Sequence, residues 1–158
     1  MATTPRVVDR APAIGLLTVL ALTVVGVAGC GRQVAVNPPA DSPAACAALA
    51  QNLPDTLDGA GRRPTTPDSP ATAAWGEPPI VMRCGVPRPA AATPTAVLLE
   101  VDTIGWLPET LDAGIVFTSI DWPTSEEPIY IEVAIPDAYA SPGSVVADLT
   151  SALTLTRR

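Results

Sequence analysis

Proline spacing limits the length of every regular element in this chain. The sequence holds 19 prolines in 158 residues, and only Pro5 and Pro12 lie within its first thirty positions. An internal proline lacks a backbone donor and interrupts a helix or a central strand. Beyond residue 42 the longest proline-free stretch follows Pro142. We therefore expect short elements over most of the chain and one longer helix at its end.

Two segments show the alternation of a half-buried strand. Residues 80–85 and 129–135 place an apolar side chain at every second position, and in an extended chain these positions share one face. The clearer series consists of Ile129, Ile131, Val133 and Ile135. Weaker candidates for strands are residues 97–102, 104–107 and 115–120.

Two segments carry the signature of a helix start. Ser42-Pro43 and Ser141-Pro142 each place a capping residue before a proline in the first helical turn. Apolar residues then recur on one helical face. These patterns predict a helix over 43–52 and a second helix from Pro142 toward Arg157.

The order of these elements indicates an α+β domain. We expect a single small domain with a mostly antiparallel sheet of about four to five short strands, an N-terminal helix and a C-terminal helix. A β-sandwich with terminal helices is the alternative. Residues 58–72 are rich in Gly, Pro, Arg and Thr, and are expected to form a flexible surface loop.

The first thirty residues resemble an export signal. Arg6 and Arg10 precede a run without charged residues from Ala11 to Gly31. The run leads into Val27-Ala28-Gly29-Cys30, which resembles the bacterial lipobox. That resemblance implies cleavage before Cys30 and lipidation of its thiol.

The expected organisation follows from this interpretation. Residues 1–29 form a signal peptide, residues 30–41 an extended tether, and residues 42–158 an extracytoplasmic domain. An uncleaved single span is the main alternative, because about 20 apolar residues cross a bilayer. An ordinary secretory signal with a chance cysteine is the third. Both the lipidated form and the single span place the domain outside the cell, attached to its membrane.

Two cysteines remain once Cys30 carries a lipid. An even count in an oxidising compartment predicts a disulfide between Cys46 and Cys84. Such a bridge stabilises a domain by about 4 kcal/mol in the chain-entropy model. Two buried free thiols are the alternative.

The charged residues exclude several classes of function. The net charge is −7, and the chain has no histidine and no lysine, since all nine basic residues are arginines. An acidic chain without a basic surface is a poor ligand for phosphate backbones, so no nucleic-acid partner is expected. The usual general base, zinc ligand and Schiff-base residue are also missing. We expect no cofactor and no catalytic residues.

Four residues are candidates for a binding surface. Trp75, Trp106 and Trp122 lie beside Gly or Pro at strand ends and could stack on glycans. Arg83 would point away from Cys84 and could pair with an anionic ligand. The alternative is that the tryptophans pack in a small core and that Arg83 pairs with Glu77 or Glu132.

Carboxylates offer a weaker enzymatic interpretation. Glu100 and Asp102 would share one strand face, which makes a carboxylate-dependent hydrolase conceivable. Asp55 and Asp58 could hold Ca²⁺, although turn formation accounts for them equally well. A carboxylate- or metal-dependent envelope hydrolase is therefore the alternative function.

A resemblance to a known family is carried by residues 75–87, together with Cys46, Leu49 and residues 53–54 upstream and residues 130–133 downstream. This part of the sequence resembles the actinobacterial family called domain of unknown function 3515, or DUF3515. The most specific part is the Trp-Gly-acid-Pro run that leads into Arg-Cys-Gly. The resemblance implies a small exported envelope protein, a lipoprotein or a membrane protein, and it implies no activity.

The sequence thus favours a non-enzymatic binding module on the outer face of the cytoplasmic membrane. It would attach through an N-terminal lipid or a single span. Its partner would be an envelope protein, a glycan or a lipid.

Overall fold

The computed structural model describes residues 1, 32–124 and 127–157. Eight strands form one open sheet in the order β2-β3-β5-β6-β10-β9-β8-β7, with every neighbouring pair antiparallel. The strands are β2 (Thr56–Leu57), β3 (Ala60–Arg63), β5 (Thr72–Trp75), β6 (Ile80–Val86), β7 (Leu99–Val101), β8 (Ile104–Leu111), β9 (Gly114–Ser119) and β10 (Tyr130–Pro136). A separate parallel pair joins β1 (Val34–Ala35) to β4 (Thr65–Thr66).

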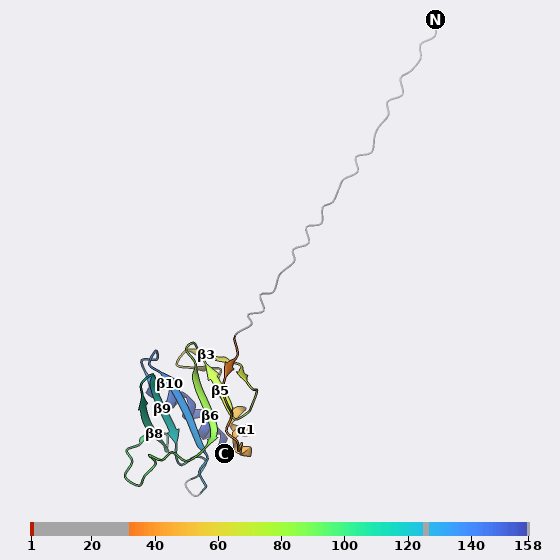
Figure 1. Cartoon of the computed structure of the whole chain (residues 1–158). Helices are drawn as coiled ribbons and strands as arrows, with labels where there is room; N and C mark the ends of the chain where they lie inside the picture. The colour runs from red at the N-terminus through yellow and green to blue at the C-terminus, as the bar shows by residue number, and fades with distance from the viewer. Residues whose placement is uncertain (2–31, 125–126, 158) are drawn as a thin grey trace.

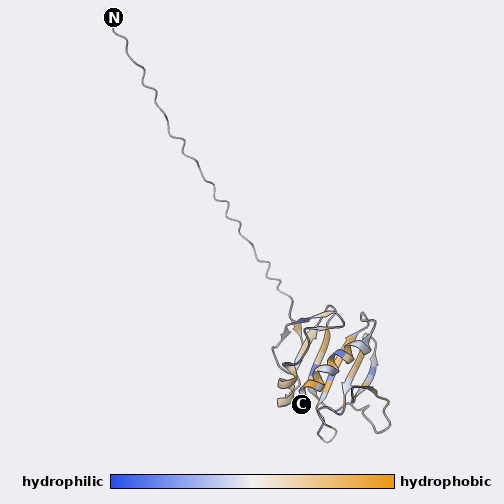
Figure 2. Cartoon of the chain, turned by 180° about the vertical axis from the view of Figure 1, so that it is seen from behind, coloured by the Kyte–Doolittle hydropathy of each residue, from blue (hydrophilic) through white to orange (hydrophobic). Residues whose placement is uncertain are grey.

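Two helices cover one face of the sheet, α1 (Ala44–Ala50) and α2 (Pro142–Thr156) (Figure 1 and Figure 2). This arrangement confirms the expected α+β class and the predominantly antiparallel sheet. The sheet has eight strands where four to five were expected. The expected signal peptide beyond Met1 and the lipobox cysteine Cys30 lie outside the described residues.

The core lies between the helices and the inward face of the sheet. β6 and β10 supply alternate residues to it, as their sequence pattern predicts, and α2 supplies an apolar stripe. These side chains are at most 2% exposed: Ile80, Met82, Cys84, Ile131, Val133, Ile135, Val145, Val146, Leu149 and Leu153. Burial of this apolar surface is the main force that holds the helices on the sheet.

A disulfide joins Cys46 of α1 to Cys84 of β6, with the two Cα atoms 5.7 Å apart. Both residues are fully buried. The predicted bridge is therefore confirmed in this structure, and it fixes the short first helix to the middle of the sheet.

The expectation of a flexible loop over residues 58–72 is wrong. The segment contains all of β3 and all of β4. The β2–β3 turn contains Asp58 and Gly59 with positive φ angles of 47° and 77°. These strands carry Gly, Arg and Thr and show no apolar alternation. They form because β1, β2 and β5 supply their backbone partners.

Pro108 lies inside a strand, where a boundary was expected at Leu107. β8 continues to Leu111, and Pro108 pairs with Phe117 of β9. β7 pairs with β8 only as far as Trp106, so Pro108 occupies a part of β8 that has a neighbour on one side only. A missing backbone N–H is tolerated at such an edge.

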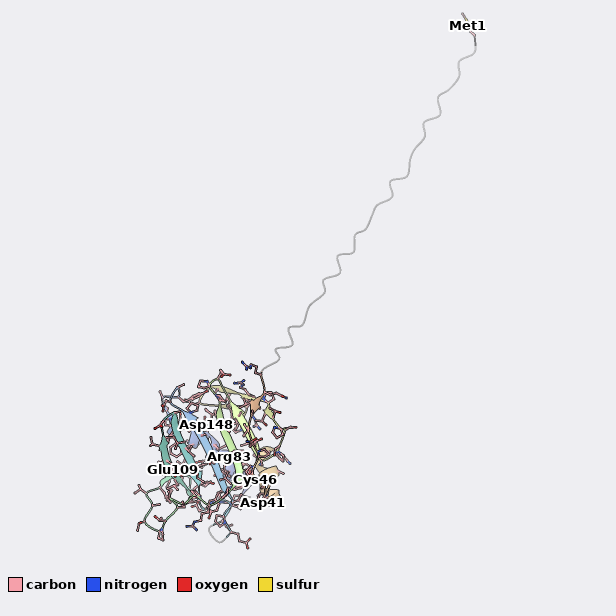
Figure 3. The ribbon with its side chains drawn as sticks, viewed as in Figure 1. Met1, Asp41, Cys46, Arg83, Glu109 and Asp148 are labelled. Carbon is pink, nitrogen blue, oxygen red and sulfur yellow. A yellow bond between two sulfur atoms is a disulfide. The ribbon has the colours of Figure 1, made fainter. Side chains whose placement is uncertain are left out.

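The segment expected as a tether is packed against the domain from Val34 onward. Val34 and Val36 are 9% and 5% exposed and lie with Ala74 and Val81 on the sheet face opposite the helices. The chain then reaches Asp41, near Cys46 (Figure 3). Gly85 has φ +87°, and a Cβ there would lie 2.6 Å from the Asp41 carbonyl oxygen. The folded unit therefore begins before Ser42.

Candidate functional site

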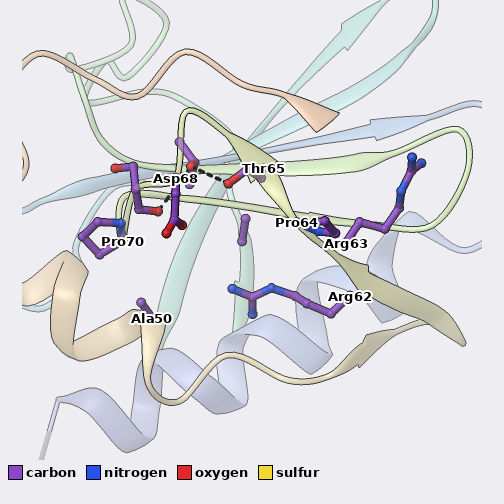
Figure 4. A pocket seen from close by; sticks show the side chains of 10 residues that line it. Ala50, Arg62, Arg63, Pro64, Thr65, Asp68 and Pro70 are labelled. Atoms are coloured by element: carbon purple, nitrogen blue, oxygen red, sulfur yellow. Dashed lines mark hydrogen bonds between the residues drawn. The ribbon is translucent and has the colours of Figure 1, made fainter. Parts of the chain in front are cut away.

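A cleft of about 600 Å³ lies between the end of α1 and the strands β3, β4 and β5 (Figure 4). It is open to solvent along one side and contains both polar and apolar side chains. Its lining residues are Ala50, Arg62, Arg63, Pro64, Thr65, Asp68, Ser69, Pro70, Thr72 and Ala73. A volume of this size falls in the range of about 300–1,000 Å³ that is usual for small-molecule sites.

Arg62 is the cationic side chain of this cleft. It lies in β3 directly opposite Trp75 of β5, and its guanidinium carbon is 4.9 Å from the centre of the Trp75 ring. The ring is fully buried, and its Nε1–H donates to the Pro54 carbonyl at 2.9 Å. Since the indole is fully buried and its N–H is hydrogen-bonded, it is a rigid platform for the Arg62 guanidinium.

The electrostatic environment of Arg62 leaves its charge available. Partial burial of the guanidinium lowers the pKa of Arg62, and the negative charge of Asp55 partly opposes this change. Among the described residues, the Arg62 side chain takes part in no ion pair or hydrogen bond. Its planar donors therefore face the cleft without a protein acceptor.

The opposite rim of the cleft is acidic and hydroxylated. Figure 4 shows Asp68 on this rim, across the cleft from Arg62. Ser69 accepts a hydrogen bond from the Ala71 N–H at 3.2 Å, and the hydroxyls of Thr65 and Thr72 lie 3.2 Å apart. The Thr65 and Thr72 hydroxyls are buried, so the rim offers a ligand the Asp68 carboxylate and the Ser69 hydroxyl.

Arg63 also lines the cleft, but its guanidinium is bonded to other groups of the protein. It pairs with Glu77 and donates to the carbonyls of Gly76 at 2.8 Å and Arg32 at 2.7 Å. Consecutive strand residues point to opposite faces, which separates the roles of Arg62 and Arg63.

The three tryptophans proposed as a binding surface lie in the core. Trp75, Trp106 and Trp122 are each 0% exposed. Trp106 donates to the Thr150 hydroxyl, and Trp122 donates to the Leu153 carbonyl, each at 3.0 Å. The interpretation as exposed stacking rings is therefore wrong, and packing in a small core explains the residues. Trp75 serves the cleft indirectly, by supporting Arg62.

Arg83 also has a structural partner. It lies opposite Glu132 on the neighbouring strand, and its Nη2 donates to Glu132 Oε1 at 2.7 Å. Glu132 is one of the two acids suggested as its partner. The pair lies on the sheet face away from the helices, so Arg83 does not contribute to the cleft.

The candidate acidic residues are dispersed. Glu100 lies in β7 opposite Gly105, whereas Asp102 has φ 46° and lies in the turn that follows. The Asp58 carboxylate accepts from the Ser144 hydroxyl at 3.0 Å, and the Asp55 carbonyl accepts from the Arg62 N–H. Within the described residues, no group of three or more Cys, Asp or Glu side chains is arranged to hold a metal ion.

Sequence reasoning missed Arg62 and Asp68 as site residues. Both lie in the segment expected as a loop, and neither belongs to a recognisable motif. The nearest sequence signal is an arginine pair close to a proline-rich turn. It gives no indication that one arginine faces a tryptophan thirteen positions later.

No helix within residues 32–124 and 127–157 combines the length and apolar character needed to span a bilayer.

The comparisons with known proteins place the domain in one family. No curated protein and no solved structure was found to match the chain. A family model described as "Protein of unknown function (DUF3515)" matches residues 12–156, which is most of the sequence. The chain therefore belongs to the DUF3515 family.

Proposed function

We propose that this protein is a non-enzymatic binding module, held at the outer face of the cytoplasmic membrane, whose cleft binds a carboxylated saccharide. The observation that carries the proposal is the Arg62 guanidinium, which lies over Trp75 and faces the cleft with no acceptor among the described residues. The tether in this proposal rests on the sequence of residues 1–30.

The charge arrangement of the cleft favours a ligand with an anionic group. A guanidinium binds a carboxylate through two parallel hydrogen bonds, and such charge-assisted bonds are stronger than neutral ones. Because the Arg62 fork is already positioned by Trp75, little conformational entropy is lost when the ligand binds.

The opposite rim favours hydroxyl or amide donors on the same ligand. Asp68 accepts hydrogen bonds, and the Ser69 hydroxyl both donates and accepts. Apolar contacts are available from Ala50, Pro64 and Pro70. A sugar ring that carries a carboxylate combines an anion, several donors and an apolar face within this space.

Two sugars that differ in one group test the proposal. N-acetylmuramate carries a lactyl carboxylate, and N-acetylglucosamine lacks it. In calorimetric titrations of the full chain in detergent, we expect N-acetylmuramate to bind about tenfold or more tightly than N-acetylglucosamine, because only the former pairs with Arg62.

Variants of the cleft locate the effect. Arg62→Gln should weaken N-acetylmuramate binding about tenfold, and Arg62→Lys less, since it keeps the charge but loses the planar fork. Arg88→Gln is the matched control, because it removes the same charge from an exposed site outside the cleft. Equal affinity for the two sugars, or equal affinity of the Arg62→Gln variant and the unmodified chain, would disprove the proposal.

A further inference from the structure

One end of the sheet brings two turns and the end of β10 together near Arg32, the first residue of the described range 32–124. Trp75 pairs with Ile80, and Gly114 pairs with both Leu111 and Pro136. The turns 76–79 and 112–113 and the end of β10 therefore lie at the same end of the sheet. We call it the proximal end.

Arg32 is attached to this proximal end. Its carbonyl accepts from Arg63 Nη2 at 2.7 Å, and Arg63 also pairs with Glu77 of the turn 76–79. Val34 is buried two residues later and pairs with Thr65 of β4. The position at which the domain is joined to its N-terminal region is therefore set by packing.

The proximal end also carries an apolar groove. The groove has a volume of about 180 Å³ and is lined by Pro79, Leu111, Ala113, Val116, Ala134 and Pro136, among others. Leu111 is 59% exposed. By register, Ala134, Val116 and Leu111 lie on the sheet face opposite the helices, so no described helix covers them.

The chain length between the anchor and the domain brings this groove close to the bilayer. Only four peptide units separate Cys30 from Val34, and a fully extended chain spans at most about 3.6 Å per residue, or about 14 Å in total. The bound is similar whether the anchor is a lipid on Cys30 or a span that ends near Gly31. Either anchor keeps Val34 within about 14 Å of the anchored residue, so the proximal end lies next to the headgroup region of the bilayer.

We propose that the proximal end is a membrane-contact surface, and that Leu111 and its neighbours Pro79, Ala113 and Pro136 insert into the interface of the anchoring bilayer. The proposal rests on the membrane attachment in the proposed function and is independent of the sugar ligand. Asp112 and Asp137 flank the groove, so burial of apolar area drives the contact, and attraction to anionic lipids does not. The opposite end of the sheet then points away from the membrane.

Two leucines of similar exposure provide the test. Leu111 at the proximal end is 59% exposed, and Leu155 near the end of α2 is 56% exposed. Figure 1 shows the C-terminal end of α2 at the end of the domain away from β3 and β1. The variants Leu111→Trp and Leu155→Trp are made in the full chain, produced in a lipoprotein-processing bacterium. Each is reconstituted into phosphatidylcholine vesicles with and without brominated acyl chains, which quench nearby tryptophan emission.

The unmodified chain supplies the background of the three buried tryptophans. We expect brominated lipid to reduce the added emission of Leu111→Trp by about twofold or more, with little effect on Leu155→Trp, because an inserted ring lies about 5–10 Å into the interface. Both positions are more than half exposed, so the substitutions leave the core intact.

Flotation of the unmodified chain with the vesicles separates the two proposals. Flotation with equal quenching at both positions, or with none at either, overturns the membrane-contact surface and leaves the attachment in place. A chain that does not float overturns both the attachment and the surface, whereas the sugar titrations are unaffected by either result.

Discussion

The half of the sheet formed by residues 56–86 and the half formed by residues 99–136 are stabilised in different ways. In the first half β2, β3 and β5 have two to four residues each and lie beside β6, which has seven. Three contacts with other segments hold this half: the Cys46–Cys84 disulfide joins β6 to α1, Trp75 of β5 donates to the Pro54 carbonyl, and β4 pairs with β1. In the second half β8, β9 and β10 have eight, six and seven residues.

The two halves show two ways in which a proline-rich chain stabilises the strands of a wide sheet. Long strands stabilise themselves through many cross-strand pairs and a shared apolar face. Strands of two to four residues make too few pairs, so they depend on covalent and long-range contacts. The cleft lies in the first half, where the buried and hydrogen-bonded Trp75 positions Arg62.

Removal of the disulfide should destabilise the first half of the sheet more than any other change proposed here. The double variant Cys46→Ala with Cys84→Ala is expected to lower the free energy of unfolding by about 2–5 kcal/mol, because the unfolded chain regains the entropy of an open loop. Denaturant unfolding of the full chain measures the loss. Hydrogen exchange should rise in β2, β3 and β5 and change little in β8 and β9. Uniform loosening of both halves would contradict the comparison. Chemical reduction of the unmodified chain should reproduce the pattern.

Replacement of Trp75 should lower the free energy of unfolding less than loss of the disulfide does. Trp75→Phe removes the hydrogen bond to the Pro54 carbonyl, leaves a small cavity and narrows the platform under Arg62. We expect a loss of about 1–3 kcal/mol by thermal or denaturant unfolding.

Trp106→Phe is the matched control in the second half. It also loses an indole hydrogen bond, but its acceptor Thr150 still donates to the Val146 carbonyl. Trp75→Phe should therefore speed hydrogen exchange in β2 and β3, and Trp106→Phe should not. The same exchange pattern in both variants would show that the halves are not distinct.

The smallest effect is expected where the halves meet. Arg83 of β6 and Glu132 of β10 form an ion pair across the junction, with side chains 38% and 24% exposed. A double-mutant cycle with Arg83→Met and Glu132→Gln should give a coupling energy of about 0.2–1 kcal/mol, because solvent screens the pair. A coupling energy above about 3 kcal/mol would instead indicate a buried pair that locks the halves together.

The sequence alone determined the elements whose burial follows a local period. Alternation predicts β6 and β10 within one residue of their observed bounds, the Ser-Pro signatures predict α1 and α2, and cysteine parity predicts the bridge. These features are legible because burial on one face of a strand or helix repeats every second or every third to fourth residue. The lipid anchor at Cys30 rests on the resemblance of residues 27–30 to the lipobox and remains a prediction.

The tertiary structure alone decided the short strands and the cleft. β3 and β4 are strands because β1, β2 and β5 offer backbone partners, and Pro108 fits in β8 because β7 ends beside it. Arg62 becomes a candidate ligand-binding residue only when register places it over Trp75, while Arg63 turns to the other face and pairs with Glu77. Cross-strand partners are set by pairing between distant segments, and a local sequence pattern carries no record of that pairing.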